Sequence, residues 1–161
     1  MTCHPGKKLL FMGQDFGQLR EWSEEREIDW FLLQEEPHRK LQEYYADLLT
    51  IYKKYPALYA MDNDPSGFEW INADDGDRSI FSFVRSHLPE EIIFCMWLIS
   101  LLWIVRIQSR CTKEKQYKQI MDENGLLTEP KTFKAEKQEC DNRPFSFAYP
   151  LPAYGVAVFT Y

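Results

Sequence analysis

Apolar and polar residues along the chain form blocks that predict different elements in its two halves. The first block is an apolar run at positions 9–12, which lies between Gly6 and Gly13. A short apolar run bounded by glycines is typical of a buried strand, so we expect one over residues 7–12. A long loop over residues 13–33 should follow, and a loop of that length is either functional or disordered. Three aromatic residues favour a functional loop: Phe16, Trp22 and Trp30.

The next block predicts an amphipathic helix. Apolar residues recur at spacings of three and four and form one stripe, which comprises Leu41, Tyr44, Tyr45, Leu48, Leu49 and Tyr52. Glu35 and Glu36 place negative charge where a helix N-terminus favours it, and Pro37 suits the first turn. Lys53 and Lys54 complement the C-terminal end of the helix dipole, and Pro56 ends the helix.

The remainder of the chain has the pattern of short antiparallel strands. Residues 61–67 are rich in turn formers and mark a candidate domain boundary. Two β-like runs, 68–72 and 78–85, are joined by a segment that contains Asp75-Gly76, a strong hairpin signal. Further β-like runs occupy 117–121 and 156–161. We therefore expect an antiparallel β-sandwich over residues 65–161.

Composition narrows the classes of function. The hydrophobic share of 45% and charged share of 27% are typical of a folded globular protein. Lys and Arg total 19 against 25 Asp and Glu, a net charge of −6 that argues against nucleic-acid binding. The aromatic share of 16% is high, and it suits either a dense core or a surface that stacks on sugar rings.

Motifs for metal, cofactor or covalent chemistry are not evident. The four cysteines are widely spaced, which favours reduced thiols, and the three histidines lack metal-ligand spacing. The sequence has no phosphate-binding loop or nucleophile elbow. We therefore expect no cofactor and no metal.

One apolar run requires a comparison with a membrane span. Residues 92–105 are apolar apart from Ser100, but the run is shorter than the roughly 20 residues a spanning helix needs. We expect a buried strand there and no membrane, with a membrane-tethered small protein as an alternative. The N-terminal residues lack a targeting pattern, which predicts a cytoplasmic protein.

A specific signal comes from several longer motifs. The chain resembles the bacterial 1,4-alpha-glucan (glycogen) branching enzymes of the alpha-amylase superfamily over most of its length. The motifs that carry the resemblance are His4-Pro5-Gly6-Lys7-Lys8-Leu9-Leu10-Phe11-Met12-Gly13-Gln14-Asp15-Phe16-Gly17-Gln18, Arg20-Glu21-Trp22, Ile28-Asp29-Trp30, Tyr55-Pro56-Ala57-Leu58-Tyr59 and Gly67-Phe68-Glu69-Trp70-Ile71-Asn72. At Asp15 the sequence departs from the family, which usually has Glu.

The resemblance implies an α+β fragment of a larger enzyme. Residues 1–60 would be the last strand-helix unit of a (β/α)8 barrel, and residues 65–161 an all-β antiparallel sandwich domain. The implied function is the C-terminal part of an enzyme that transfers alpha-1,4-glucan segments to 6-hydroxyls in glycogen synthesis. Such enzymes act by the retaining scheme with two carboxyl groups. In the family those groups lie on earlier barrel strands, so the resemblance implies no catalytic residue in this chain and an inactive fragment.

The resemblance also assigns a substrate-contacting loop. Loops that follow the strands of a (β/α)8 barrel build its active site, so Asp15, Glu21 and Trp22 would line or support a cleft for glycogen or amylose. Trp22 would be the sugar-stacking platform. Alternatively, Trp22 and Trp30 only fasten the loop. The second functional hypothesis is a non-catalytic glucan-binding or enzyme-associating module formed by the sandwich.

Two further expectations concern the fragment as a polypeptide. A complete barrel takes ~250 residues, so the stripe of Leu41, Tyr44, Leu48 and Tyr52 would lack its sheet and promote self-association. The resemblance also fades between residues 92 and 112, which are rich in Trp, Leu and Ile. We hypothesise that residues 95–112 are translated in a shifted reading frame. The rival explanation is true divergence into a buried pair of strands.

Overall fold

The computed structural model describes residues 1–77, 79–88, 91–98, 103–108, 116–122, 124–140, 143–152 and 154–160. An extended, turn-rich N-terminal segment leads into the short helix η1 (Trp30–Gln34) and the long helix α1 (Glu36–Lys54). Two single turns, η2 (Pro56–Leu58) and η3 (Pro65–Gly67), connect α1 to the strands. The strands are β1 (Phe68–Asp75), β2 (Ile80–Leu88), β3 (Glu91–Leu98), β4 (Trp103–Gln108), β5 (Gln116–Asp122), β6 (Gly125–Leu126), β7 (Thr132–Lys134), β8 (Ser146–Leu151) and β9 (Val156–Thr160).

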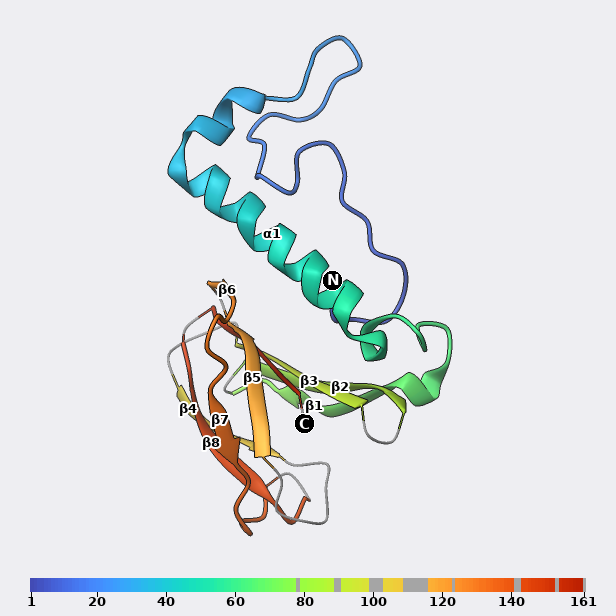
Figure 1. Cartoon of the computed structure of the whole chain (residues 1–161), viewed down its shortest axis with the longest axis vertical. Coiled ribbons are helices and arrows are strands. Elements are labelled where there is room, and N and C mark those ends of the chain that lie inside the picture. Colours follow the sequence, from blue (N-terminus) through green and yellow to red (C-terminus); the bar gives the residue numbers. More distant parts are fainter. Residues whose placement is uncertain are drawn as a thin grey trace.

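Helix α1 forms where the apolar stripe predicts it. Glu36 occupies its first turn, and Lys53 and Lys54 occupy its last, so the charges at both ends oppose the helix dipole. The helix ends before Pro56, where η2 begins. Ile51 is buried on the side of α1 that faces the sheet. The N-terminal segment begins against the larger sheet, where Cys3 is buried, and then runs alongside α1 (Figure 1).

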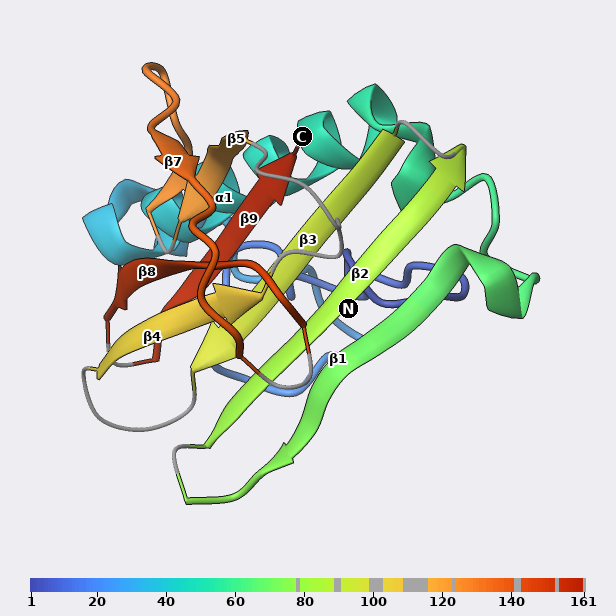
Figure 2. The ribbon, with the colours of Figure 1, turned by 90° about the horizontal axis from the view of Figure 1, so that it is seen from below.

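The described strands form two antiparallel sheets. The larger has seven strands in the order β1-β2-β3-β9-β5-β6, with β7 also paired to β5. The smaller sheet pairs β4 with β8, with Val105 opposite Tyr149. Figure 2 shows the smaller sheet on one side of the larger one and α1 on the other. The larger sheet is therefore covered on both faces.

Successive side chains of β9 point to opposite faces of the larger sheet, as is usual in a strand. Ala157 and Phe159 point into a cluster shared with the smaller sheet, where Phe147 and Tyr149 of β8 are buried. Val158 instead points into a second cluster, which faces α1 and η2. This second cluster comprises Cys3, Ile51, Ala57, Leu58, Phe83, Ile120, Met121 and Val158. One face of the larger sheet thus packs on the smaller sheet, and the other face joins the β half to the N-terminal half.

The expected strand over residues 7–12 is wrong. The structure has turns and irregular backbone there, and Leu9, Phe11 and Met12 are 67%, 41% and 48% exposed. An apolar run forms a strand only where a neighbouring strand accepts and donates its backbone hydrogen bonds. Among the described residues, no strand of either sheet pairs with residues 7–12.

The apolar run over residues 92–105 is not a single strand. Its described parts belong to β3 in the larger sheet and β4 in the smaller sheet. The proposed frame error covers residues 95–112, of which 99–102 and 109–112 lie outside the described residues. A search of the described helices finds none with the length and apolar character of a membrane span.

The expectation that the helix stripe lacks a partner is wrong for three of its four members. Tyr44, Leu48 and Tyr52 pack, partly buried, against the cluster between α1 and the larger sheet. Leu41, nearer the start of α1, remains 36% exposed. The sheet of the β half therefore covers the C-terminal part of the stripe. Self-association remains a prediction, but it must rest on other residues.

Candidate functional site

A tight turn shapes the beginning of the predicted substrate loop. The backbone carbonyl of Gly13 accepts hydrogen bonds from the amides of Phe16 at 3.2 Å and Gln18 at 3.0 Å. Gly13 has a φ of +83°, and a Cβ there would come within 2.9 Å of the Phe16 ring. Glycine therefore satisfies both the backbone and the packing requirement of this turn. Phe16 is completely buried beneath it.

The turn is fastened to the first half of α1. The His38 imidazole Nδ1 lies 2.7 Å from the carbonyl oxygen of Phe16 and donates a hydrogen bond to it. The Gln42 side-chain amide donates to Oδ2 of Asp15 at 3.2 Å. Both contacts join residues that are far apart in the sequence. The carboxylate of Asp15 is therefore half-buried against the helix.

An ion pair between an exposed arginine and a buried carboxylate closes the base of the loop. Arg20 donates two hydrogen bonds to Asp29, one from Nε at 2.8 Å and one from Nη2. The amide of Asp29 also donates to the side-chain oxygen of Gln18 at 2.8 Å. The hydrogen bonds from Arg20 lower the pKa of Asp29 and raise the pKa of Arg20. Asp29 is only 4% exposed, so the pair is held within the loop.

The outer part of the loop presents two of the predicted residues to solvent. Trp22 is 42% exposed, and its ring meets the edge of Phe11 with centroids 5.3 Å apart. Glu21 is exposed, and its backbone carbonyl accepts a hydrogen bond from Arg26. In the described chain, no hydrogen bond or ion pair joins Asp15 to Glu21 or Trp22. The loop thus holds the three predicted residues on one segment without placing them in one contact group.

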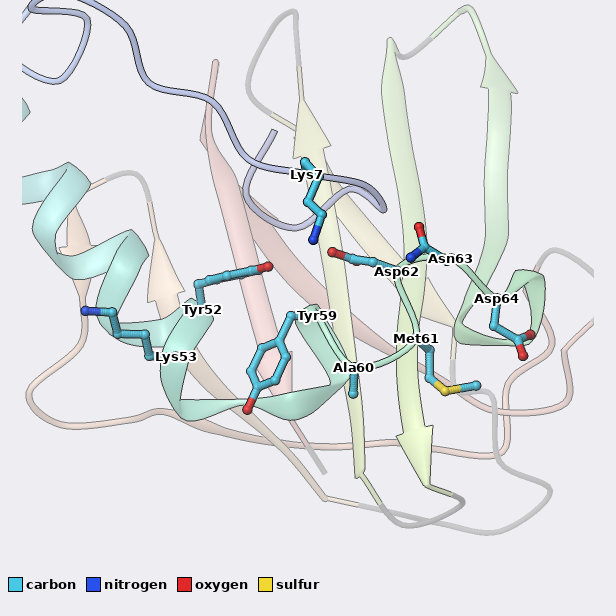
Figure 3. Close-up of a pocket in the computed structure, with 9 residues that line it drawn as sticks. All are labelled: Lys7, Tyr52, Lys53, Tyr59, Ala60, Met61, Asp62, Asn63 and Asp64. Atoms are coloured by element: carbon cyan, nitrogen blue, oxygen red, sulfur yellow. The ribbon is translucent and has the colours of Figure 1, made fainter.

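Sequence reasoning missed a cavity of about 640 Å³ near the C-terminal end of α1. Its lining residues come from the N-terminal segment, from α1 and from the connection to β1, as Figure 3 shows. They are Lys7, Tyr52, Lys53, Tyr59, Ala60, Met61, Asp62, Asn63 and Asp64. Residues 61–64 had only the signal of a turn, and nothing in the sequence indicated that Lys7 would lie opposite them.

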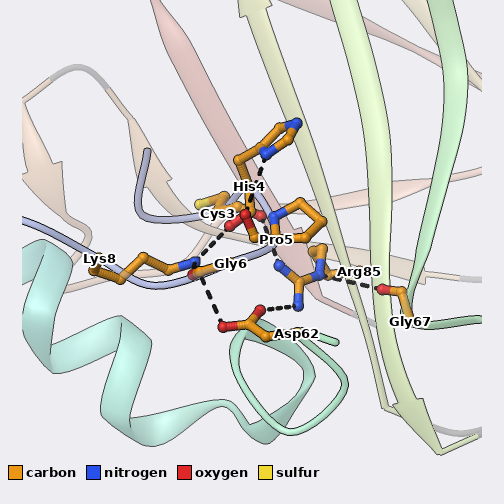
Figure 4. Close-up of polar contacts among 8 residues, drawn as sticks. All are labelled: Cys3, His4, Pro5, Gly6, Lys8, Asp62, Gly67 and Arg85. Atoms are coloured by element: carbon orange, nitrogen blue, oxygen red, sulfur yellow. Dashed lines mark hydrogen bonds and ion pairs between the residues drawn. The ribbon is translucent and has the colours of Figure 1, made fainter. Parts of the chain in front are cut away.

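A buried arginine supports one wall of this cavity. Arg85 of β2 has no solvent exposure, and it donates hydrogen bonds to the carbonyls of Gly67 and Cys3 at 3.1 and 3.3 Å. Its third bond, 2.6 Å long, goes to Oδ1 of Asp62. The ammonium of Lys8 lies 3.7 Å from the other carboxylate oxygen (Figure 4). Burial lowers the pKa of Lys8, and the charge of Asp62 opposes that effect.

Within the part of the chain that the structure describes, no three His, Cys, Asp or Glu side chains are grouped to hold a metal ion. Both the loop and the cavity offer carboxylates, amides and aromatic rings. These groups suit a polyhydroxylated ligand, because hydroxyls can donate to carboxylates and accept from amides and ammonium groups.

Comparison with characterised proteins identifies the family. The chain is 44% identical to a 1,4-alpha-glucan branching enzyme of Butyrivibrio fibrisolvens over 174 residues, which cover 100% of this chain and 26% of the relative. A branching enzyme of Geobacillus stearothermophilus is 31% identical over 98% of this chain and 26% of its own length. One of Bacillus caldolyticus is 52% identical over 85 residues, or 53% of this chain and 13% of that enzyme. No protein-family model matches the chain.

Solved structures of similar fold are alpha-glucan enzymes of low sequence identity. The catalytic module of SpuA, a pneumococcal glycogen-degrading virulence factor, superposes with a TM-score of 0.58 at 10% identity and covers 84% of this chain and 20% of that one. A Bacillus subtilis type I pullulanase complexed with maltose gives a TM-score of 0.53 at 13% identity, over 83% of this chain and 17% of that one. These likenesses support the fold alone.

These relatives confirm the resemblance that the sequence motifs indicated. The chain spans about a quarter of the length of the Butyrivibrio fibrisolvens and Geobacillus stearothermophilus enzymes. The coarse fold, an α+β fragment with antiparallel sheets, agrees with the solved structures. A free-standing module is not favoured, since each relative described here is a branching enzyme. Over nearly its whole length, the chain therefore matches the C-terminal part of 1,4-alpha-glucan branching enzymes.

Proposed function

We propose that the complete protein transfers alpha-1,4-glucan segments to 6-hydroxyls, and that this chain contributes substrate contacts to that reaction. The observation that carries the proposal is the 44% identity to a branching enzyme over the whole chain. The chain spans 26% of that relative, so the activity belongs to a larger protein. Glycogen and amylose are the proposed glucan partners.

The proposed domain layout follows the two halves of the structure. Residues 1–60 are the last strand-helix unit of a (β/α)8 barrel, and residues 65–161 are an all-β sandwich. The shared core between the two sheets supports the sandwich. The exposed apolar run at residues 9–12 supports the barrel assignment, because such a run becomes a strand once neighbouring strands are supplied.

We propose that Asp15 and Asp29, two carboxylates that the loop holds in hydrogen bonds, are not a catalytic pair. A retaining mechanism needs a nucleophile and an acid/base group about 5–5.5 Å apart, both free to act on the substrate. Asp15 is hydrogen bonded to Gln42, and Asp29 is paired with Arg20. We therefore propose that the catalytic pair lies in the remaining part of the enzyme. This chain alone would be inactive.

The proposed role of the loop is to contact glucan beside the reacting bond. Trp22 offers a partly exposed aromatic face, held against Phe11 in a loop whose base is fixed by Arg20 and Asp29. A fixed aromatic ring binds a sugar ring with little loss of conformational entropy. Asp15 and Glu21 would accept hydrogen bonds from sugar hydroxyls. In the complete enzyme, the remaining polypeptide would cover the apolar side of the same loop.

Site-specific oxidation of tryptophan tests this role. The purified chain is treated with N-bromosuccinimide with and without maltoheptaose, and peptide mass spectrometry reads Trp22 and Trp30 separately. Trp30 is a matched control, because its ring is 53% exposed and lies on Phe16 in the same loop. We expect maltoheptaose to slow the oxidation of Trp22 and to leave Trp30 unchanged. Equal oxidation of Trp22 with and without the sugar would contradict the proposed contact.

A further inference from the structure

We propose that the cavity lined by Lys7, Tyr52 and residues 59–64 is a second sugar site, which binds a short alpha-1,4-glucan segment away from the Asp15–Trp22 loop. The choice of an alpha-glucan rests on the proposed function, whereas the case for a sugar rests on the cavity itself. Its volume of about 640 Å³ falls within the range of small-molecule sites. The loop site and this cavity share no residue.

Three polar groups from three segments converge in the cavity. Figure 3 shows the Lys7 amino group, the Tyr52 hydroxyl and the Asp62 carboxylate pointing toward one another. An ammonium only donates hydrogen bonds, a carboxylate only accepts them, and a phenol does both. Adjacent hydroxyls of a pyranose can satisfy all three, because each hydroxyl donates one bond and accepts others. The Asn63 amide adds a further donor and acceptor at the rim.

The carboxylate is oriented before any ligand arrives. Asp62 is held by the Arg85 guanidinium at 2.6 Å on one oxygen and by the Lys8 ammonium at 3.7 Å on the other. Its side chain is only 12% exposed, and that of Arg85 is fully buried. These contacts, which Figure 4 shows, fix the direction of the carboxylate. A fixed acceptor lowers the entropy cost of binding.

Two tyrosine rings supply the apolar wall that a pyranose also needs. The Tyr52 and Tyr59 ring centroids are 5.5 Å apart with planes inclined by 60°. The Lys8 ammonium lies 5.3 Å from the Tyr52 centroid and holds that ring in place. Tyr59 is 40% exposed, so its ring is open to a ligand. Burial raises the pKa of the Tyr52 hydroxyl, which keeps it protonated.

The charge of the lining favours a neutral sugar over an anion. Asp62 and Asp64 both line the cavity, and their carboxylates would repel a phosphate placed among them. The Lys7 ammonium offsets part of that charge. A neutral polyol can use the carboxylates as hydrogen-bond acceptors without any such penalty.

Calorimetric titration with maltotriose tests the assignment in the full chain. All measurements use a Trp22→Ala background, which removes the proposed stacking contact of the loop. We expect Lys7→Met to weaken binding about tenfold, the loss expected for a hydrogen bond from a charged donor. The matched control is Lys53→Met, because Lys53 lines the same cavity but its amino group points away from the other polar groups (Figure 3). It should change the affinity by less than about twofold.

Two outcomes would overturn the assignment of a sugar site to the cavity. One is the loss of all maltotriose binding in the Trp22→Ala chain itself. The other is unchanged affinity in both Lys7→Met and Asn63→Ala, since these two exposed residues supply polar groups of the cavity without supporting the fold. Equal binding of cellotriose would refute the alpha-glucan assignment. Failure of the loop proposal would appear separately, as the absence of Trp22 protection by maltoheptaose.

Discussion

Replacing Arg85 by methionine removes a buried guanidinium from the junction of three segments. Arg85 lies in β2, and its hydrogen bonds reach Cys3 in the N-terminal segment and Asp62 and Gly67 in the connection after α1. Methionine has a similar length and fills most of the space. The variant therefore tests the polar contacts more than the packing.

The expected loss follows from what the guanidinium leaves behind. The Asp62 side chain is 12% exposed and would retain only Lys8, at 3.7 Å, as a charged partner. Removing one member of a buried ion pair costs about 3–5 kcal/mol, because the remaining charge stays desolvated. A domain of this size is stable by about 5–15 kcal/mol. We therefore expect Arg85→Met to lower the free energy of unfolding by about 3–5 kcal/mol.

Urea unfolding monitored by circular dichroism measures this loss, with Arg143→Met as the matched control. The Arg143 and Glu69 side chains form an ion pair but are 33% and 32% exposed, so its removal should cost no more than about 1 kcal/mol. Adding Asp62→Asn to Arg85→Met should recover part of the loss, because an amide carries no buried charge. If Arg85→Met and Arg143→Met destabilise the chain equally, the reasoning about the junction is refuted.

Two further predictions concern pH and association. The ion pair with Arg20 lowers the pKa of Asp29 in the folded chain below its ordinary value of 3.8. The ion pair therefore stabilises the fold above pH 3.8, and this stabilisation is lost as the pH falls through the pKa of Asp29 in the folded chain. The difference in unfolding free energy between the native chain and Arg20→Met should therefore shrink as the pH is lowered from about 6 to about 2.5. A difference that stays constant over this range would show that the ion pair does not stabilise the fold. We also expect the isolated chain to self-associate through exposed apolar residues of its N-terminal loop, because burying each of them is worth about 1.5–3 kcal/mol. Sedimentation velocity measures this association, and a monomer at every concentration would contradict the prediction. These residues are Leu9, Phe11, Met12, Leu19, Trp22, Trp30 and Phe31.

Elements with strong local signals were predictable from the sequence. The stripe and charged ends of α1 were sufficient to locate the helix, and Asp75-Gly76 correctly indicated the hairpin between β1 and β2. Strand β8 was not predicted, since it contains Pro150 and proline cannot donate a backbone hydrogen bond to a neighbouring strand. Proline is tolerated at the edge of a sheet, and β8 belongs to a sheet of only two described strands.

Features that depend on distant contacts were not predictable. The run at residues 9–12 has the composition of a strand, but strand formation requires a neighbour that the described chain does not supply there. Asp15 was chosen by resemblance, and its bond to Gln42 arises from how the loop folds back on α1. The Lys7 cavity has no local signal, because it forms only where the N-terminal segment meets the end of the helix.

The most direct test of the account is a branching assay on the purified chain. Amylose is incubated with the chain, treated with a debranching enzyme and sized, and the complete Butyrivibrio fibrisolvens branching enzyme serves as the positive control. We expect new short side chains with the complete enzyme and none with this chain, because the proposed catalytic pair of the retaining mechanism lies in the remaining part of the enzyme. New side chains that appear with this chain and disappear in Asp15→Asn would contradict the account and make Asp15 a catalytic residue.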